Sequence, residues 1–158
     1  MKRAAVIVCS TRAAAGIYPD RTGPTIVEWL RGRSLETDAA VVVADGPDVA
    51  AALESALSSG VNLIVTTGGT GITATDRTPE ATAAVLDREL PGFSEELRRR
   101  GAASTPFALM SRGLAGVAGG TFVVNLPGST AGVLDGLALL SEILDHVLDQ
   151  LDGGTHGE

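Results

Sequence analysis

A glycine-rich stretch, TTGGTGITATDRTPE at residues 66–80, is the part of the chain most suggestive of chemistry. Glycines at positions 68, 69 and 71 let a backbone approach a ligand closely, and consecutive amides in such a loop can hold an anion. No lysine follows as it does in a P-loop, and the spacing is not G-x-G-x-x-G. Taken alone, the stretch fits either a phosphate cradle or a tight turn between a strand and a helix.

The side chains available for catalysis are few. The only lysine is Lys2, the only cysteine is Cys9, and the two histidines, His146 and His156, lie near the C-terminus. This inventory excludes a Walker lysine, argues against Schiff-base chemistry and provides no convincing zinc set. Cys9 fits a small buried strand residue better than a nucleophile, because no histidine lies near it in sequence. Catalysis would have to use carboxylates, hydroxyls, arginines, backbone amides and a borrowed Mg²⁺.

Two aspartates, Asp45 and Asp76, each follow an apolar run. Either one alone could be a helix-capping or turn acid. Two carboxylates facing a phosphate in a chain of net charge −7 would repel it, unless a Mg²⁺ bridges carboxylate and phosphate. Together they therefore predict a catalytic and metal-binding pair.

Other polar residues follow apolar runs in the same way. They are Ser10 and Thr11, then Thr70 among the glycines Gly68, Gly69 and Gly71, and finally Ser129 after Pro127 and Gly128. Ser111, Arg112 and Gly113 instead stand before a strand. Arg112 could pair with phosphate oxygens, since a guanidinium binds them bidentately, or could belong to an ordinary turn. Ser129 or Thr130 could cap a helix whose first amides suit an anion, or the segment could be a plain helix entry.

The elements that must position these residues follow from hydrophobic periodicity. Nearly continuous β-branched runs predict strands at 4–9, 39–44, 61–67 and 121–126, with a further strand around 108–117. Helical spacing predicts helices at 24–32, 48–58, 78–88, 93–100 and 130–151, with Thr78 as the N-cap of the third. This order predicts an α/β three-layer sandwich with a mostly parallel sheet. In such sheets ligands bind beyond the carboxyl ends of the strands, where the polar segments that follow the four strands fall.

Composition narrows the class of protein further. The 158 residues suit one domain over 1–152 with a flexible tail at 153–158. No apolar run reaches membrane-spanning length, and MKRAAVIVCSTR fits a first strand better than a secretion signal. A net charge of −7 disfavours nucleic-acid binding, and the arginines at 98–100 fit a solvated helix face. We therefore expect a cytoplasmic protein that binds neither nucleic acid nor membrane.

Several motifs together resemble one known family. TTGGTG followed by D-x-T-P-E, then SRGLAG, then a strand ending in N-L-P-G-S, is similar to the Mog/MoaB-type molybdenum cofactor biosynthesis family. The first loop, CSTRAAAGIYPDRTGP, fits the same family, and the resemblance extends over residues 4–150. Several motifs in the right order are far more specific than any one of them.

The resemblance implies a molybdenum cofactor biosynthesis fold that binds molybdopterin. It also implies an adenylyltransferase that joins AMP from Mg-ATP to the terminal phosphate of molybdopterin and releases pyrophosphate. The functional aspartates of the family correspond to Asp45 and Asp76, and its pterin-binding serine and asparagine to Ser111 and Asn125. By the same resemblance we expect a homotrimer, or a hexamer, and contacts with other molybdenum cofactor enzymes.

One departure from the family pattern, and one sign of its branch, leave alternatives open. Gly46 stands where a second acid often follows the first aspartate, and the LPGST ending looks more like the MoaB branch than the Mog branch. One alternative function is a molybdopterin carrier or scaffold without turnover. The other is a nucleotide pyrophosphatase related to CinA-type proteins.

Overall fold

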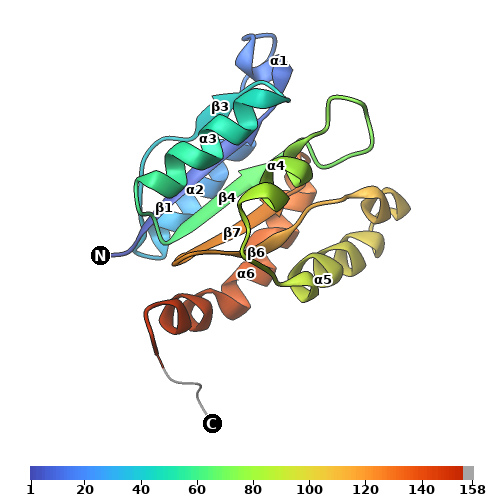
Figure 1. Cartoon of the computed structure of the whole chain (residues 1–158). Helices are drawn as coiled ribbons and strands as arrows, with labels where there is room; N and C mark the ends of the chain where they lie inside the picture. The colour runs from blue at the N-terminus through green and yellow to red at the C-terminus, as the bar shows by residue number, and fades with distance from the viewer. Residues whose placement is uncertain (155–158) are drawn as a thin grey trace.

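The computed structural model describes residues 1–154 as a sheet between two layers of helices (Figure 1). The strands are β1 (Arg3–Cys9), β2 (Glu36–Thr37), β3 (Val41–Val43), β4 (Leu63–Thr67), β5 (Arg88–Glu89), β6 (Ala115–Ala118) and β7 (Thr121–Leu126). The helices are α1 (Thr11–Ala14), α2 (Thr22–Gly32), α3 (Pro47–Ser58), α4 (Thr78–Val85), α5 (Pro91–Ala102), the 3-10 helix η1 (Pro106–Met110) and α6 (Thr130–Leu151). The predicted tail, 153–158, lies outside the described residues except for its first two.

The sheet has the order β2-β1-β4-β7-β6-β5, with β3 also paired to β1. Strands β1, β4 and β7 run parallel at its centre, whereas β6 runs antiparallel to both of its neighbours, β7 and β5. Ile64 and Val65 on β4 are both fully buried although they face opposite sides, as expected of a strand covered on both faces. The predicted α/β fold with a mostly parallel sheet is therefore confirmed.

Each face of the sheet packs against its own set of helices. Val65 belongs to a core completed by Leu30 of α2 and Leu140 of α6, while Ile64 belongs to a second core with Leu53 of α3. Figure 1 accordingly places α3 and α4 on one side of the sheet and α2 and α6 on the other. Within the described residues no helix is long and apolar enough to cross a membrane.

The structure corrects some predicted boundaries. The strand expected at 39–44 is only β3, which pairs with β1 at the edge of the sheet, where Val41 is 54% exposed. The short strand β2, which also pairs with β1, was not predicted. The strand expected around 108–117 starts only at Ala115, because η1 ends at Met110 and residues 111–114 form an irregular connection. Half-exposed edge segments lose the burial that makes hydrophobic runs reliable predictors of strands.

The start of α4 also differs from the prediction. Arg77, and not Thr78, is the N-cap, and its side chain makes no capping hydrogen bond. Thr78 is already helical and fully buried, with its hydroxyl packed beside the backbone of Gly69. The helix ends at Val85, three residues earlier than predicted, because Arg88 pairs with β6.

Register decides where the polar segments meet. Val8 of β1 lies opposite Thr67 of β4, and Thr67 lies opposite Leu126 of β7. The three strands therefore end side by side, and the chain leaves them at Ser10, Gly68 and Pro127 along one edge of the sheet. This edge is where the sequence placed the candidate site.

The longest helix offers a test of the core. We expect Leu140→Ala on α6 to lower the free energy of unfolding by about 2–5 kcal/mol, because the lost side chain is fully buried and leaves a cavity. Leu134→Ala on the same helix is the control, because that side chain is 54% exposed. Urea denaturation followed by circular dichroism measures both. Equal losses for the two variants would contradict the packing described here.

Candidate functional site

The turn after β4 is so tight that two of its residues must be glycine. Gly68 and Gly69 have φ angles of +89° and +69°, which side-chain-bearing residues rarely adopt. A Cβ on Gly68 would lie 2.3 Å from the carbonyl oxygen of Cys9, and one on Gly69 would lie 2.2 Å from the Thr78 hydroxyl. The turn is thus pressed against both β1 and the start of α4.

The carbonyl and amide groups of this turn are used very differently. The Gly69 carbonyl accepts from the Thr78 amide, the Thr70 carbonyl from the Arg112 amide, and the Gly71 carbonyl from the Arg112 side chain. In contrast, the amides of residues 69–71 have no acceptor anywhere in residues 1–154. The Gly68 amide differs, since it donates to the Leu126 carbonyl at 3.1 Å. The phosphate cradle expected from residues 68–71 is therefore limited to the last three amides.

Asp45 lies just beyond β3 and is held by the first loop. Thr11 Oγ1 donates to Asp45 Oδ2 at 3.2 Å, and the Asp45 amide donates back to the same hydroxyl at 3.1 Å. The other oxygen, Oδ1, is buried and has no hydrogen-bond partner within residues 1–154. It packs against Gly69, where an added Cβ would lie 3.0 Å away. The carboxylate is oriented by its neighbours yet keeps one oxygen for a ligand.

Asp76 folds back over the glycine turn. Its Oδ2 accepts from the Thr73 amide at 3.0 Å and from the Thr73 hydroxyl at 2.7 Å. A Cβ on Gly71 would lie 2.7 Å from the same oxygen, so glycine at this position leaves space for the carboxylate.

Two cavities open along this edge of the sheet. One, of about 840 Å³, contains both aspartates, and we call it the acidic cavity. Of the predicted site residues it is lined by Ser10, Thr11, Asp45, Gly68, Gly69, Asp76 and Gly128. The other, of about 600 Å³, has a largely nonpolar lining that includes Leu97, Phe107 and Met110, and we call it the apolar cavity. Its predicted residues are Thr70, Gly71, Ser111, Gly113, Asn125, Pro127, Gly128 and Ser129.

The two cavities meet at the start of α6. Gly128 lines both of them, and a Cβ there would lie 3.3 Å from the Cα of Gly68. Ser129 is the N-cap of α6, and its hydroxyl accepts a hydrogen bond from the Gly132 amide at 3.1 Å. This was one of the two interpretations that the sequence left open for Ser129. The glycine turn and the amino end of α6 together separate the cavities.

Asn125 forms part of the floor of the apolar cavity and is only 2% exposed. Its Nδ2 donates to the hydroxyls of Thr66 and Thr82 at 2.9 and 3.0 Å, and its Oδ1 accepts from the Leu114 amide at 3.0 Å. The side-chain amide therefore joins β4, β7, α4 and the segment before β6.

Ser94 is a cavity residue that sequence reasoning missed. It lies in the first turns of α5, is 6% exposed, and lines the apolar cavity. Its buried hydroxyl has no hydrogen-bond partner within residues 1–154. An unpaired buried hydroxyl is costly unless a ligand or water satisfies it. Nothing in the sequence PGFSEELRRR distinguishes this serine, because its burial depends on how α5 packs.

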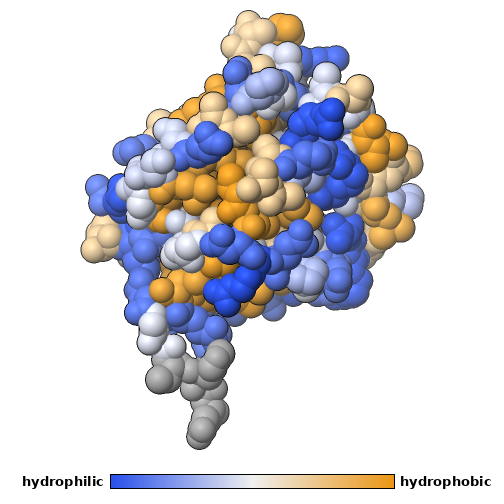
Figure 2. Space-filling model, in the orientation of Figure 1, coloured by the Kyte–Doolittle hydropathy of each residue, from blue (hydrophilic) through white to orange (hydrophobic). Residues whose placement is uncertain are grey.

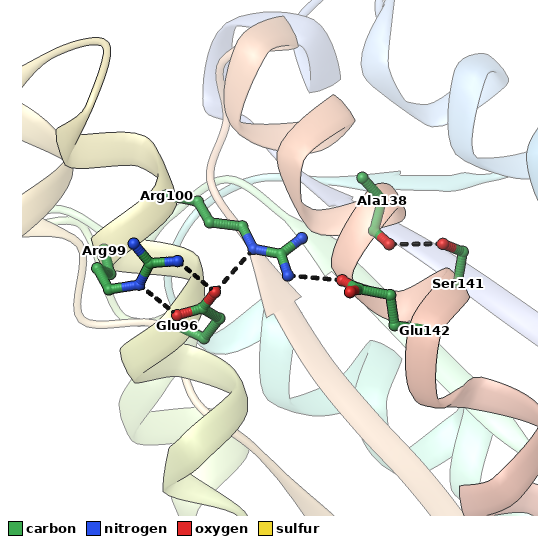
Figure 3. Close-up of polar contacts among 6 residues, drawn as sticks. All are labelled: Glu96, Arg99, Arg100, Ala138, Ser141 and Glu142. Atoms are coloured by element: carbon green, nitrogen blue, oxygen red, sulfur yellow. Dashed lines mark hydrogen bonds and ion pairs between the residues drawn. The ribbon is translucent and has the colours of Figure 1, made fainter.

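An ion-pair network holds α5 against α6 (Figure 3). It thereby helps to shape the wall of the apolar cavity that α5 forms. Glu96 accepts from Arg99 and Arg100, and Arg100 also reaches Glu142 on α6 at 2.6 Å. Hydrogen bonds from the two arginines lower the pKa of Glu96 to about 2. Arg98 differs from these two, since its Nη1 donates inward to the Ser111 carbonyl at 3.2 Å. The prediction that the arginines at 98–100 lie on a solvated helix face therefore fits Arg99 better than Arg98.

The remaining reactive groups are unsuited to nucleophilic chemistry. Burial raises the pKa of the Cys9 thiol to about 11, so the thiol stays protonated at neutral pH. His146 is exposed on α6 and contacts Gln150. Residues 1–154 contain no group of three or more acidic, histidine or cysteine side chains that could hold a metal. A Mg²⁺ here would need further oxygens from a substrate, which is how Mg²⁺ commonly binds beside phosphates.

Comparisons with known proteins identify the family of this chain. The family described as "Probable molybdopterin binding domain" matches residues 5–146. A molybdenum cofactor biosynthesis bifunctional protein of Synechococcus elongatus is 42% identical over 98% of this chain. The match covers 49% of that relative, so the chain spans about half its length.

Two further relatives match over more of their length. The molybdopterin adenylyltransferase of Escherichia coli is 36% identical, covering 85% of this chain and 71% of the relative. The solved Mog protein of Mycobacterium ulcerans superimposes with a TM-score of 0.90 and 50% identity, covering 96% of this chain and 99% of that one. The chain therefore belongs to the molybdopterin-binding domain family of molybdenum cofactor biosynthesis proteins, as its resemblance to the Mog/MoaB type predicted.

Proposed function

We propose that this protein binds molybdopterin and ATP and transfers AMP to the terminal phosphate of molybdopterin, with release of pyrophosphate. The observation that carries the proposal is the set of unpaired amides at residues 69–71, which lie between the acidic and the apolar cavity. Unpaired consecutive amides favour a phosphate, and their place between two cavities suits a phosphate shared by two substrates.

ATP belongs in the acidic cavity under this proposal. The free Oδ1 of Asp45 and the carboxylate of Asp76 would hold a Mg²⁺, which neutralises phosphate charge when bound. The donor set fits, because hard carboxylate oxygens are the ligands that Mg²⁺ prefers. Thr11 keeps Asp45 oriented and Thr73 keeps Asp76 oriented, so both carboxylates are positioned before the substrate arrives.

Molybdopterin belongs in the apolar cavity. The nonpolar wall made by Leu97, Phe107 and Met110 suits the flat pterin ring, and Ser94 and Ser111 offer hydroxyls to its polar edge. The amino end of α6, a helix of 22 residues, lies at the junction with the acidic cavity and favours an anion there. The terminal phosphate of the pterin would thus reach the nucleotide beside Gly128.

The chemistry needs no side-chain nucleophile. An oxygen of the pterin phosphate attacks the α-phosphorus of ATP, a new P–O bond forms, and the bond to the leaving pyrophosphate breaks. The protein contributes by holding the two substrates in line and by placing amide donors where charge gathers. A protonated Cys9 and a distant His146 are consistent with this division of labour.

The names of the relatives support the proposal. The relative in Escherichia coli is a molybdopterin adenylyltransferase, and the 50% identical structure carries the Mog name, which favours the enzyme over the MoaB-type carrier. Exposed apolar side chains such as Ile17 and Leu109, 71% and 64% exposed, leave surface for the predicted homotrimer or hexamer. Figure 2 shows hydrophobic residues interspersed with hydrophilic ones on one face of the molecule. Contacts with other molybdenum cofactor enzymes and a cytoplasmic location remain predictions.

Asp76→Asn tests the proposed role of the acidic cavity. We expect adenylyl transfer to fall by about 10²-fold or more, because the charge that holds Mg²⁺ is lost, while binding of molybdopterin is unchanged. Transfer is measured as pyrophosphate and adenylated pterin formed from molybdopterin and Mg-ATP. Asp48→Asn, an exposed acid in the first turn of α3, is the control that should leave the rate unchanged.

Other results of the same assay would decide against the proposal. Full turnover by Asp76→Asn would remove its metal role, and unaltered kinetics of Asp45→Asn would do the same for Asp45. Binding of the pterin without pyrophosphate release by the wild-type protein would identify a carrier. Nucleotide hydrolysis without adenylated pterin would identify a pyrophosphatase of the CinA type.

Ser94→Ala tests the proposed place of the pterin. Loss of one hydrogen bond of about 1 kcal/mol should weaken molybdopterin binding roughly fivefold and leave ATP binding unchanged. Ser141→Ala on α6 is the control, because its hydroxyl is exposed and bonds only to the Ala138 carbonyl of its own helix. Calorimetric titration with each substrate measures the effect. Weaker ATP binding with unchanged pterin binding would contradict the assignment of the cavities.

A further inference from the structure

Arg112 is the only predicted site residue that lines neither the acidic nor the apolar cavity. All three nitrogens of its guanidinium donate to protein acceptors. Nε donates to the Gly71 carbonyl at 2.8 Å, Nη2 to the Asp76 carbonyl at 2.9 Å, and Nη1 to Glu80 Oε2 at 2.8 Å. Because every nitrogen is engaged, the planar guanidinium holds its three acceptors in fixed relative positions. Lysine has a single ammonium group and cannot reproduce this arrangement.

The acceptors lie at both ends of one exposed loop. Gly71 and Asp76 flank residues 72–75, where Ile72 is 66% exposed, and Glu80 lies in the first turn of α4. Figure 1 shows this loop projecting from the body of the molecule beside α4. One side chain therefore joins the beginning of the loop, its end and the helix that follows.

Arg112 provides all the hydrogen bonds that link residues 71–77 to segments outside 66–81, within the described residues 1–154. The hydrogen bonds of the Asp76 carboxylate and amide all go to Thr73, within the loop itself. Contacts inside the loop can shape it, but they cannot determine where it lies relative to the cavity.

Arg112 is itself firmly anchored. Its amide donates to the Thr70 carbonyl at 2.8 Å, and Arg98 of α5 donates to the carbonyls on either side of it, at Ser111 and Gly113. The contact between Arg112 and Glu80 is also favourable in charge. The hydrogen bond from Arg112 lowers the pKa of Glu80 and keeps that carboxylate ionised. A continuous set of contacts thus runs from α5, through residues 111–113, to the loop that carries Asp76.

We infer that Arg112 is a positioning residue that sets the place of Asp76 at the acidic cavity, and not a ligand of substrate phosphate. The inference rests on the proposed function, in which Asp76 faces the nucleotide. Without the guanidinium the loop keeps its internal Thr73 contacts but loses its side-chain attachment to the body of the protein. Asp76 is then still present but is displaced from its substrate.

Arg112→Lys separates these two roles, because lysine keeps the charge but cannot reach three acceptors. We expect amide hydrogen exchange of residues 72–77 to become about tenfold faster, since charge-assisted hydrogen bonds at both ends of the loop are weakened. We expect kcat for adenylyl transfer to fall about 10²-fold, as for a misplaced catalytic group, with KM for ATP and molybdopterin changed less than twofold. Free guanidinium ion added to an Arg112→Gly variant should restore part of kcat.

Arg77→Lys is the matched control, because Arg77 is an exposed arginine of the same region whose side chain makes no capping bond. Exchange and kinetics should match those of the wild type. If the Arg112 variants fail to fold, Glu80→Gln weakens only one arm of the contact and should give a smaller increase in exchange and a smaller loss of kcat.

Each outcome decides one question. Wild-type exchange and wild-type kcat in Arg112→Lys would overturn the inference. Unchanged exchange with a KM raised tenfold or more would also overturn it and identify Arg112 as a phosphate ligand. If the wild-type protein forms no adenylated pterin, the proposed function fails, yet faster loop exchange in Arg112→Lys would still support the attachment of the loop.

Discussion

The site depends on one constraint, the contact between the turn after β4 and the end of β1. Gly68 lies so close to the Cys9 carbonyl that no side chain fits between them, and Gly69 packs as closely against Thr78. Neighbouring segments donate hydrogen bonds to the carbonyl oxygens of this turn, whereas the amides of residues 69–71 have no acceptor within residues 1–154. The packed turn and the proposed phosphate cradle are therefore the same feature.

The remaining architecture brings two unlike environments to this surface. The acidic cavity is built by loops after β1, β3 and β4, so its carboxylates come from segments distant in sequence. The apolar cavity is built by α5, η1 and the start of α6, which add nonpolar walls and the unpaired Ser94 hydroxyl. Gly128 belongs to both, because it lacks a side chain where the turn and α6 approach each other. Under the proposed function, the nucleotide and the pterin ring therefore occupy separate surfaces and meet only at this junction.

Much of the fold, and most of the candidate site residues, could be predicted from the sequence. The parallel core was predictable because β1, β4 and β7 are buried on both faces and so consist of continuous apolar runs. The short strands β2 and β5 were not, because two-residue edge segments carry no periodicity. Thr78 looked like a helix cap, yet it is buried beside Gly69, since tertiary contacts can override local capping preferences. Most of the site residues were predictable because they follow strands whose carboxyl ends share one edge.

The sequence by itself determined the type of sheet, the edge at which the polar loops gather, and the absence of a lysine, histidine or thiol suited to nucleophilic catalysis at that edge. Only the tertiary structure decided how each polar group is used. It directs the Arg112 guanidinium to Gly71, Asp76 and Glu80, pairs the Gly68 amide with Leu126, and buries Ser94 without a partner. The physical reason is that hydrophobic periodicity reflects burial along one segment. The hydrogen-bond partners of Arg112, in contrast, lie 32–41 residues away in sequence and meet it only in the folded chain.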